Sequence, residues 1–269
     1  MEIKIVDTTL RDGEQKPGVE LGMKDKIEII KLIDKTSIYQ IEAGIPAMGG
    51  DEKKTIERIM ELNLKSKIFT WNRMNIGDIQ HSIDCKVDII HISVPTSEIQ
   101  IKSKLGKDKT WVIESMRSSI YFAKNKGFEL VVGFEDASRT DTNFLIELAA
   151  LAKKEGVNRI RYADTVGILY PERIYTEVKK IKAAVDIEVG IHAHNDFGMA
   201  LANSMAAVKG GAACVDCTFG GIGERAGNCD YFKFLKLCES MKLIKEGNLI
   251  EDENLVSIIK EIQDRMKME

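Results

Sequence analysis

The sequence is poor in proline and has no long apolar segment. Only four prolines occur among 269 residues, and no low-complexity tract marks a linker, so we expect one folded domain. No segment reaches the roughly 18 consecutive apolar residues that a membrane-spanning helix needs. The N-terminus, "MEIKIVDTTL", enters a strand-like pattern without the charged and apolar regions of a secretory signal. We therefore expect a cytoplasmic protein with no membrane partner.

A large charge excess and a disulfide framework are also lacking. Thirty-nine basic and 42 acidic residues give a formal net charge of -3, and no run of Lys or Arg is interleaved with aromatic residues. A nucleic-acid partner is therefore not expected. The five cysteines are an odd number in a chain with a large core, which is typical of reduced thiols. Cys214 and Cys217 form a C-x-x-C, but on a strand this spacing sends the two thiols to opposite faces, which favours buried side chains over a zinc site.

Short apolar runs alternate with amphipathic segments along the whole chain. Eight of these runs are strand candidates: 3–6, 39–44, 66–71, 87–93, 128–134, 158–164, 187–193 and 213–219. The segments between them carry apolar residues at helical spacing, with Pro171 at a first turn and Gly127, Gly156 and Gly210 just past helix ends.

Eight such units predict an α/β fold, a closed parallel (β/α)8 TIM barrel, which typically takes about 250 residues. We assign residues 1–245 to the catalytic barrel and 246–269 to a short C-terminal helical tail that packs on the barrel or on another chain. A doubly wound open sheet fits the same alternation. No G-x-G-x-x-G follows an early strand, which counts against a dinucleotide fold.

Two of the four histidines occur in "VGIHAHND", inside an apolar run. A strand alternates its faces with period two, so His192 and His194 project from the same side. Two imidazoles on one face can share a ligand, although buried packing histidines fit the same pattern. A third metal-ligating residue close to His192 and His194 would favour a metal site over two packing histidines.

The topology of the predicted barrel supplies that third ligand. Active sites of such barrels lie at the carboxyl ends of the strands, and the last strand pairs with the first. The segments that follow strands one, seven and eight should therefore be neighbours, which adds Asp12 and Asn228 to the two histidines. Two imidazoles, a carboxylate and an amide oxygen suit a divalent cation such as Mn²⁺, Mg²⁺, Zn²⁺ or Fe²⁺.

Six motifs occur in order between Asp7 and about Asn228: "DTTLRDGEQKPGV", "IEAGIPAMGG", "EDASRTD", "ADTVGIL", "HAHNDFGMALAN" and "GGIGERAGN". Together they resemble the metal-dependent Claisen-condensation and aldol-lyase barrel family, which includes isopropylmalate synthase, homocitrate synthase and hydroxymethylglutaryl-CoA lyase. Within it, "IPAMGG", "FTWNRM", "HISVPTSEIQIKSKLGKDKTW" and "GFEDASRTD" are most similar to the homocitrate synthases associated with nitrogenase cofactor assembly, hence with nitrogen fixation. The resemblance implies an acyltransferase that condenses acetyl-CoA with 2-oxoglutarate.

The resemblance also implies roles for individual residues. It places the metal on Asp12, His192 and His194, with Asn228 as a more distant oxygen ligand. Arg11 would face the oxo group and carboxylate of the 2-oxo acid and stabilise the alkoxide that forms on attack.

Further strand-end residues complete the predicted substrate site. Thr165 would contact the oxo-acid carboxylate. His91 would help to place the oxo acid, and a buried core histidine is the alternative. Gln15 would hydrogen-bond near the thioester or a metal-bound water, and an exposed loop amide is the alternative. Glu135 is the candidate acid or base. Arg139 is a further candidate for substrate binding, and a structural Glu135–Arg139 ion pair is the alternative for both.

Other residues are expected to support the site. Glu42 would orient Arg11 or the metal shell, and Glu224 and Arg225 would brace their glycine-rich loop. Gly220 stands where homocitrate synthases often carry asparagine.

Other functions fit part of the pattern. The lyase branch runs an analogous cleavage, but it carries a cysteine in a G-C-P loop that "GGIGERAGN" lacks. Isopropylmalate- and citramalate-type synthases use the same chemistry on other oxo acids. A non-catalytic barrel subunit is the third alternative, because family synthases extend past the barrel into C-terminal subdomains whereas this sequence stops at Glu269.

The family pattern also predicts an oligomer. We expect a homo-oligomer, or a hetero-oligomer with a chain that supplies those subdomains. The residues leave open the metal, the base that deprotonates acetyl-CoA, and which of Arg73, Arg139 and Arg161 binds the far carboxylate of the oxo acid.

Overall fold

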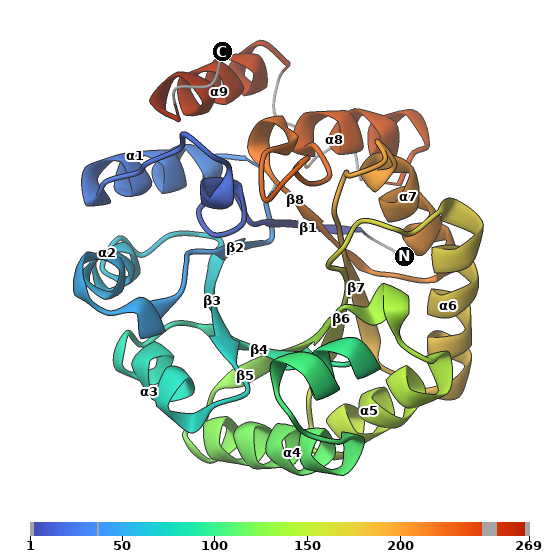
Figure 1. The fold of residues 1–269 in the computed structure, drawn as a ribbon. Coiled ribbons are helices and arrows are strands. Elements are labelled where there is room, and N and C mark those ends of the chain that lie inside the picture. The colour runs from blue at the N-terminus through green and yellow to red at the C-terminus, as the bar shows by residue number, and fades with distance from the viewer. Residues whose placement is uncertain (1–2, 37, 244–251, 267–269) are drawn as a thin grey trace.

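The computed structural model describes residues 3–36, 38–243 and 252–266. Within them, eight parallel strands form a closed barrel in which each strand pairs with the next and β8 pairs with β1 (Figure 1). The strands are β1 (Lys4–Asp7), β2 (Gln40–Glu42), β3 (Lys67–Arg73), β4 (Ile89–Pro95), β5 (Glu129–Glu135), β6 (Arg159–Asp164), β7 (Glu188–Ala193) and β8 (Cys214–Cys217). Closure excludes the open doubly wound sheet and confirms the predicted TIM barrel.

Helices surround the barrel and follow the strands in turn (Figure 1). They are α1 (Met23–Ile33), α2 (Gly50–Met60), α3 (Ile76–Asp84), α4 (Lys109–Asn125), α5 (Thr142–Lys154), α6 (Pro171–Ala184), α7 (Ala200–Gly210) and α8 (Tyr231–Ser240). Short helical turns precede five of these helices, each just after a strand: η1 (Gly13–Gln15), η2 (Pro46–Met48), η3 (Gln100–Lys104), η4 (Ala137–Arg139) and η5 (Phe219–Gly221). These turns shape the mouth at the carboxyl ends of the strands.

Local signals in the sequence fix most helix ends. Pro171 begins α6, and Gly127 and Gly156 follow α4 and α5 with left-handed φ values of 86° and 77°. The prediction for Gly210 is wrong by one residue. Gly210 is still helical, and Gly211 takes the left-handed position with φ 112°.

The interior of the barrel is filled in layers. Its lower layer is apolar and contains Val6, Phe69, Ile89, Val131 and Cys214, all nearly inaccessible to solvent. The next inward-facing residues along the strands are polar, and they line the mouth. Cys214 belongs to this interior layer whereas Cys217 packs in the outer core between strands and helices, so the two thiols lie on opposite faces as predicted.

The C-terminal tail contains one described helix, α9 (Asp252–Arg265), which packs against α1 and η5 (Figure 1). Its residues Leu255 and Ile262 are buried. The predicted boundary at 245/246 lies outside the described residues, so the division into barrel and tail stays a prediction.

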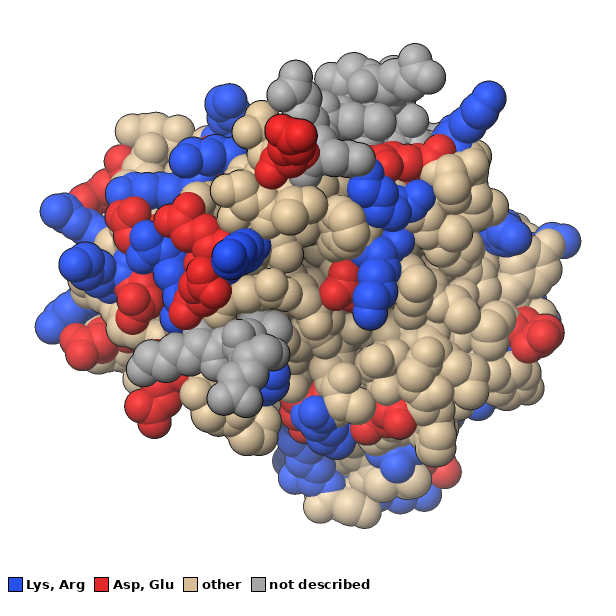
Figure 2. Space-filling view, turned by 90° about the horizontal axis from the view of Figure 1, so that it is seen from above, with Lys and Arg blue, Asp and Glu red and all other residues tan. Residues whose placement is uncertain are grey.

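The described part of the chain contains no helix long and apolar enough to cross a membrane. On the face drawn in Figure 2, basic and acidic side chains are intermixed and do not separate into patches of one sign.

Candidate metal centre and active site

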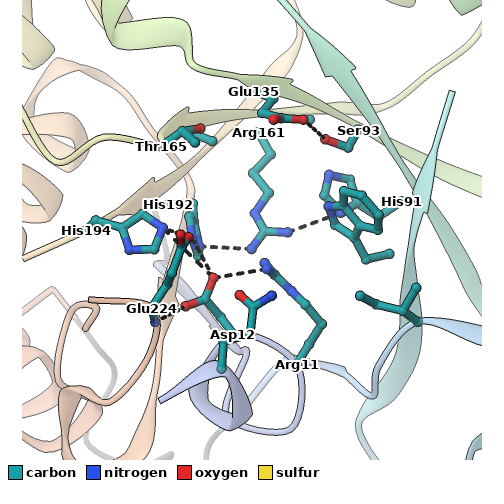
Figure 3. A pocket seen from close by; sticks show the side chains of 15 residues that line it. Arg11, Asp12, His91, Ser93, Glu135, Arg161, Thr165, His192, His194 and Glu224 are labelled. Atoms are coloured by element: carbon teal, nitrogen blue, oxygen red, sulfur yellow. Dashed lines mark hydrogen bonds and ion pairs between the residues drawn. The ribbon is translucent and has the colours of Figure 1, made fainter. Parts of the chain in front are cut away.

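Asp12, His192 and His194 converge at the mouth of the barrel (Figure 3). The Nε2 atoms of the two histidines lie 3.3 Å apart, and Oδ2 of Asp12 lies 3.4 Å from Nε2 of His192 and 3.9 Å from Nε2 of His194. Adjacent ligand atoms of a six- or four-coordinate ion lie roughly 3 to 3.5 Å apart when metal–ligand distances are near 2.1 Å. The donor set therefore fits one divalent cation.

Asn228 closes the same site from the loop after β8. Its Nδ2 donates to Oδ1 of Asp12 at 2.7 Å and to the carbonyl of Ile222 at 2.9 Å. Its Oδ1 is buried and has no hydrogen-bond partner among the residues that the structure describes. A Cβ on Gly223 would lie 2.0 Å from that Nδ2, so this loop needs glycine to approach so closely. The amide is thus in contact with one ligand residue and keeps an unpartnered oxygen, and its role as the fourth ligand stays a prediction.

The protonation of these groups suits metal binding. Burial opposes ionisation of Asp12, but Arg11 and His192 outweigh it and hold the pKa of the Asp12 carboxyl well below its usual range. Burial and the charge of His192 lower the pKa of His194 to about 3, so that imidazole is neutral. Burial and Arg161 disfavour the His192 cation, but hydrogen bonds to Asp12 and Asp216 outweigh them and raise the pKa of His192. A bound cation would take the place of that proton.

A buried charge network that the sequence analysis largely missed holds His192 in place. Nδ1 of His192 lies 3.0 Å from Oδ2 of Asp216, leaving Nε2 directed at Asp12 and His194. Arg161 forms ion pairs with both Asp216 and Glu42, at 2.8 Å to Oε1 of the latter. A carboxylate behind a ligating histidine fixes the ring orientation and strengthens the ligand.

Arg11 lies beside the three ligands and is held by two carboxylates. Its Nε donates to Oε2 of Glu42 at 2.7 Å, and its Nη1 to Oδ2 of Asp12 at 3.0 Å. Glu42 is fully buried; burial opposes its charge, but Arg11 and Arg161 outweigh it and hold the pKa of Glu42 well below its usual range. Glu42 thus orients the guanidinium of Arg11. It also helps to orient the His192 ring, because Glu42 pairs with Arg161, which pairs with Asp216 behind that ring.

A cavity of about 220 Å³ opens over these groups (Figure 3). Eight of the predicted site residues line it: Arg11, Asp12, Gln15, His91, Glu135, Thr165, His192 and His194. Of the three arginines considered for the far carboxylate, Arg161 alone is among the lining residues. Arg73 pairs with Asp78 and its side chain is 69% exposed.

Arg139 does not reach the cavity. Its guanidinium binds the buried Asp136, with Nε 2.8 Å from Oδ1, and Asp136 has the left-handed backbone that precedes η4. Among the predicted substrate-binding residues, Arg139 is therefore the one that the structure does not bring to the cavity. The structure also shows the Glu135–Arg139 ion pair to be wrong: Glu135 is paired with Lys104 of η3 at 3.0 Å and accepts from the hydroxyl of Ser93 at 3.2 Å.

The loops around the cavity are braced by Arg225. Its guanidinium donates to Oδ1 of Asp196 at 2.8 Å and to the carbonyl of Thr165 at 2.9 Å, joining the loops after β6, β7 and β8. The backbone N–H of Glu224 donates to Oδ1 of Asp12 at 3.2 Å. The hydroxyl of Thr165 accepts from the N–H of Asp136 at 2.8 Å, which leaves its proton free to donate into the cavity.

Together, the fold and the site define a (β/α)8 barrel protein with a candidate divalent-cation centre and an adjacent arginine at its carboxyl mouth. A sequence model of the HMGL-like family matches residues 2–253, and the chain belongs to that family. The family predicted from the motifs is confirmed.

Individual relatives are similar over most of the chain. The sequence is 53% identical over 264 residues to homocitrate synthase subunit alpha of Clostridium pasteurianum, covering 96% of this chain and 98% of that protein. It is 53% identical over 226 residues to 2-isopropylmalate synthase 2 of Caldanaerobacter subterraneus and 44% identical over 227 residues to homocitrate synthase 1 of Nostoc, in each case over 84% of this chain. This chain spans 59% and 60% of the length of those two relatives.

Among solved structures, the HMG-CoA lyase of Bacillus subtilis superposes with a TM-score of 0.87 at 20% identity, covering 99% of this chain and 94% of that one. At this identity the likeness shows the fold.

Proposed function

We propose that this protein is the catalytic barrel of a homocitrate synthase, which condenses acetyl-CoA with 2-oxoglutarate to give homocitrate and CoA. The observation that carries the proposal is the convergence of Asp12, His192 and His194 beside the guanidinium of Arg11. The similarity to homocitrate synthase subunit alpha over nearly both whole chains supports this substrate pair.

The side chains of the cavity suit each part of the reaction. A divalent cation held by Asp12, His192, His194 and Asn228 would polarise the ketone of the oxo acid. Arg11, fixed by Glu42, stabilises the negative charge that develops on the ketone oxygen when carbon attacks it. Thr165 donates its hydroxyl proton to the carboxylate next to the ketone.

Glu135 is the proposed base. It takes a proton from the methyl group of acetyl-CoA, and the resulting carbon nucleophile forms the new bond to the ketone carbon. Water then cleaves the thioester and releases CoA, so that acetyl-CoA, 2-oxoglutarate and water give homocitrate and CoA. Ser93 and Lys104 hold the Glu135 carboxylate in place at the cavity wall.

We further propose that the mouth is completed by another polypeptide. The Clostridium relative, which this chain covers almost entirely, is called a subunit. The Caldanaerobacter and Nostoc synthases are longer chains, and this chain covers about three fifths of each. Several large apolar side chains in the loops that follow the strands are exposed, and they suit a covered surface: Met48, Ile99, Ile168, Tyr170 and Phe197.

Free-CoA release tests the proposal. The purified chain is incubated with acetyl-CoA, Mn²⁺ and a panel of 2-oxo acids, with and without any second polypeptide encoded beside it. Release that is fastest with 2-oxoglutarate and is raised by the second polypeptide is expected. Release that is fastest with pyruvate or 2-oxoisovalerate would instead favour a citramalate- or isopropylmalate-type synthase. Cleavage of hydroxymethylglutaryl-CoA would favour a lyase.

A further inference from the structure

The imidazole of His91 forms the floor of the cavity, and three neighbours fix it. The ring stands on the apolar layer of the barrel, edge-on to Phe69 with ring centroids 6.3 Å apart. Its Nδ1 lies 3.1 Å from Oε1 of Glu42 and 3.1 Å from Nη1 of Arg161. The ring is buried, and its Nε2 has no hydrogen-bond partner in the described part of the protein.

The fourth side of the ring, its Nε2 corner, fits against β5 only because residue 133 is glycine. A Cβ on Gly133 would lie 2.1 Å from Nε2 of His91 and 3.0 and 3.2 Å from its ring carbons. Gly133 is an ordinary residue of β5 with no left-handed backbone, so the constraint on this position is space alone. Another glycine that faces the interior, Gly190 of β7, shows the contrast, since a Cβ there would meet Cys214 at 3.4 Å, an ordinary contact.

We propose that Gly133 sets the depth of the 2-oxo acid pocket by letting the His91 ring point its Nε2 corner closely at β5. A side chain at position 133 must displace the ring. The apolar layer with Phe69 blocks movement downward, and Glu42 and Arg161 block movement sideways. The ring can then move only into the cavity, which becomes shallower.

This inference rests on the proposed function and names its substrate class. The ketone and its carboxylate occupy the end with Arg11 and Thr165, so the rest of the oxo acid extends toward His91 and Ser93. A five-carbon dicarboxylic oxo acid then needs the full depth that Gly133 provides, whereas a three-carbon oxo acid does not.

Calorimetric binding of 2-oxoglutarate and of pyruvate to the Mn²⁺-loaded chain tests the inference without acetyl-CoA or a partner. Gly133→Ala should weaken 2-oxoglutarate binding by about 10-fold or more and pyruvate binding by less than about 3-fold, since loss of room for one or two carbons costs on this scale. Gly190→Ala is the matched control and should change neither affinity. Equal losses for the two acids, or a loss confined to pyruvate, would overturn the inference.

A double-mutant cycle separates the pocket effect from a folding defect. In a His91→Ala background the clash disappears, so adding Gly133→Ala should leave 2-oxoglutarate affinity within about 2-fold, because only contacting residues couple. A loss as large as in the wild-type background would contradict a role through His91. Binding of both acids without any CoA release, even in the presence of the second polypeptide, would refute the proposed synthase activity while the chain-length comparison still held.

Discussion

The Nε2 atoms of His192 and His194 lie 3.3 Å apart with their rings 82° from parallel, so two imidazoles present their ring nitrogens to one point. Oδ2 of Asp12 lies within 4 Å of both. Each histidine is buried, and Nδ1 of His194 has no partner among the described residues. Such a convergence of nitrogen lone pairs and a carboxylate is stable when a cation lies between them.

Replacing one of these histidines should remove the metal and leave the fold intact. His194→Ala is expected to lose stoichiometric Mn²⁺ or Zn²⁺ while keeping the far-ultraviolet circular dichroism of the barrel, since its ring makes few other bonds. Metal content of the folded protein is measured by mass spectrometry. His81→Ala on α3 serves as the control and should keep its metal; a folded His194→Ala protein with full metal content would show the ligand assignment to be wrong.

Arg11→Lys should reduce turnover far more than oxo-acid binding. A lysine ammonium cannot reproduce the planar donors that Arg11 directs at Glu42 and Asp12. Loss of one such donor to a developing oxyanion typically lowers kcat by about 10²-fold or more. Steady-state kinetics with 2-oxoglutarate checks this, and an unchanged kcat would exclude Arg11 from the chemistry.

Glu135→Gln should abolish carbon–carbon bond formation without weakening the metal site. The amide keeps the size of the carboxylate but cannot accept the methyl proton, and loss of a general base costs about 10²- to 10⁴-fold in kcat. Exchange of the acetyl-CoA methyl protons into deuterated water isolates this step. Wild-type exchange rates in the Gln variant would assign the base elsewhere. Lys102→Met, which removes an exposed ammonium paired with Glu98, serves as the neighbouring control.

Asp7 should make the fold less stable as the pH rises toward neutrality. Its carboxyl is fully buried, and burial, only partly offset by hydrogen bonds from Thr9, raises its pKa from 3.8 to about 7. The folded state therefore holds a proton between pH 4 and 7 that the unfolded chain has lost, so this contribution to stability is complete below pH 4 and disappears as the pH passes 7.

The magnitude is on the order of 4 kcal/mol. Asp7→Asn should remove this part of the pH dependence. The denaturation midpoint of the wild type should fall between pH 5.5 and pH 8, and that of the variant should fall less. Denaturant unfolding of both proteins across this range is the measurement. Parallel stability curves for the two would mean that Asp7 is ionised in the fold.

Lys26 should hold the loop that carries Arg11 and Asp12. Its buried ammonium lies 2.6 Å from Glu14 in that loop and 2.6 Å from Glu52 of α2, whose other oxygen accepts the N–H of Ile45 at 3.0 Å. Lys26→Met leaves two partly buried carboxylates without their cation and should lower stability by about 1 to 3 kcal/mol. Lys31→Met on the exposed side of α1 is the matched control, and equal effects of the two variants would argue against the clamp.

The barrel could be predicted because each of its units carries its own signal. Runs such as Glu188–Ala193 and Ile89–Pro95 are apolar and β-branched, and they alternate with helical periods. The ligand triad was also accessible. Period two puts His192 and His194 on one face, and closure of β8 on β1 brings Asp12 beside them.

The other contacts of the candidate site could not be predicted, because they depend on side-chain directions that the spacing of residues in the sequence does not determine. Asp216 reads as one polar residue in a short apolar strand, and only its register opposite Val6 shows that it faces His192. Arg139 follows a strand end as a site residue would, but Asp136 adopts a left-handed conformation and captures it. Lys104 reaches Glu135 because the turn after β4 is a π-helix, which the residue pattern did not indicate.

Detection of the new carbon–carbon bond tests the central proposal most directly. The chain, with its second polypeptide where one exists, is incubated with Mn²⁺, 2-oxoglutarate and acetyl-CoA labelled with ¹³C at the methyl carbon, and the products are followed by ¹³C NMR. The account predicts that the label appears in the methylene group of homocitrate, in amounts equal to the free CoA released. Free CoA accompanied by labelled acetate alone, or a labelled product formed only with a different 2-oxo acid, would contradict it.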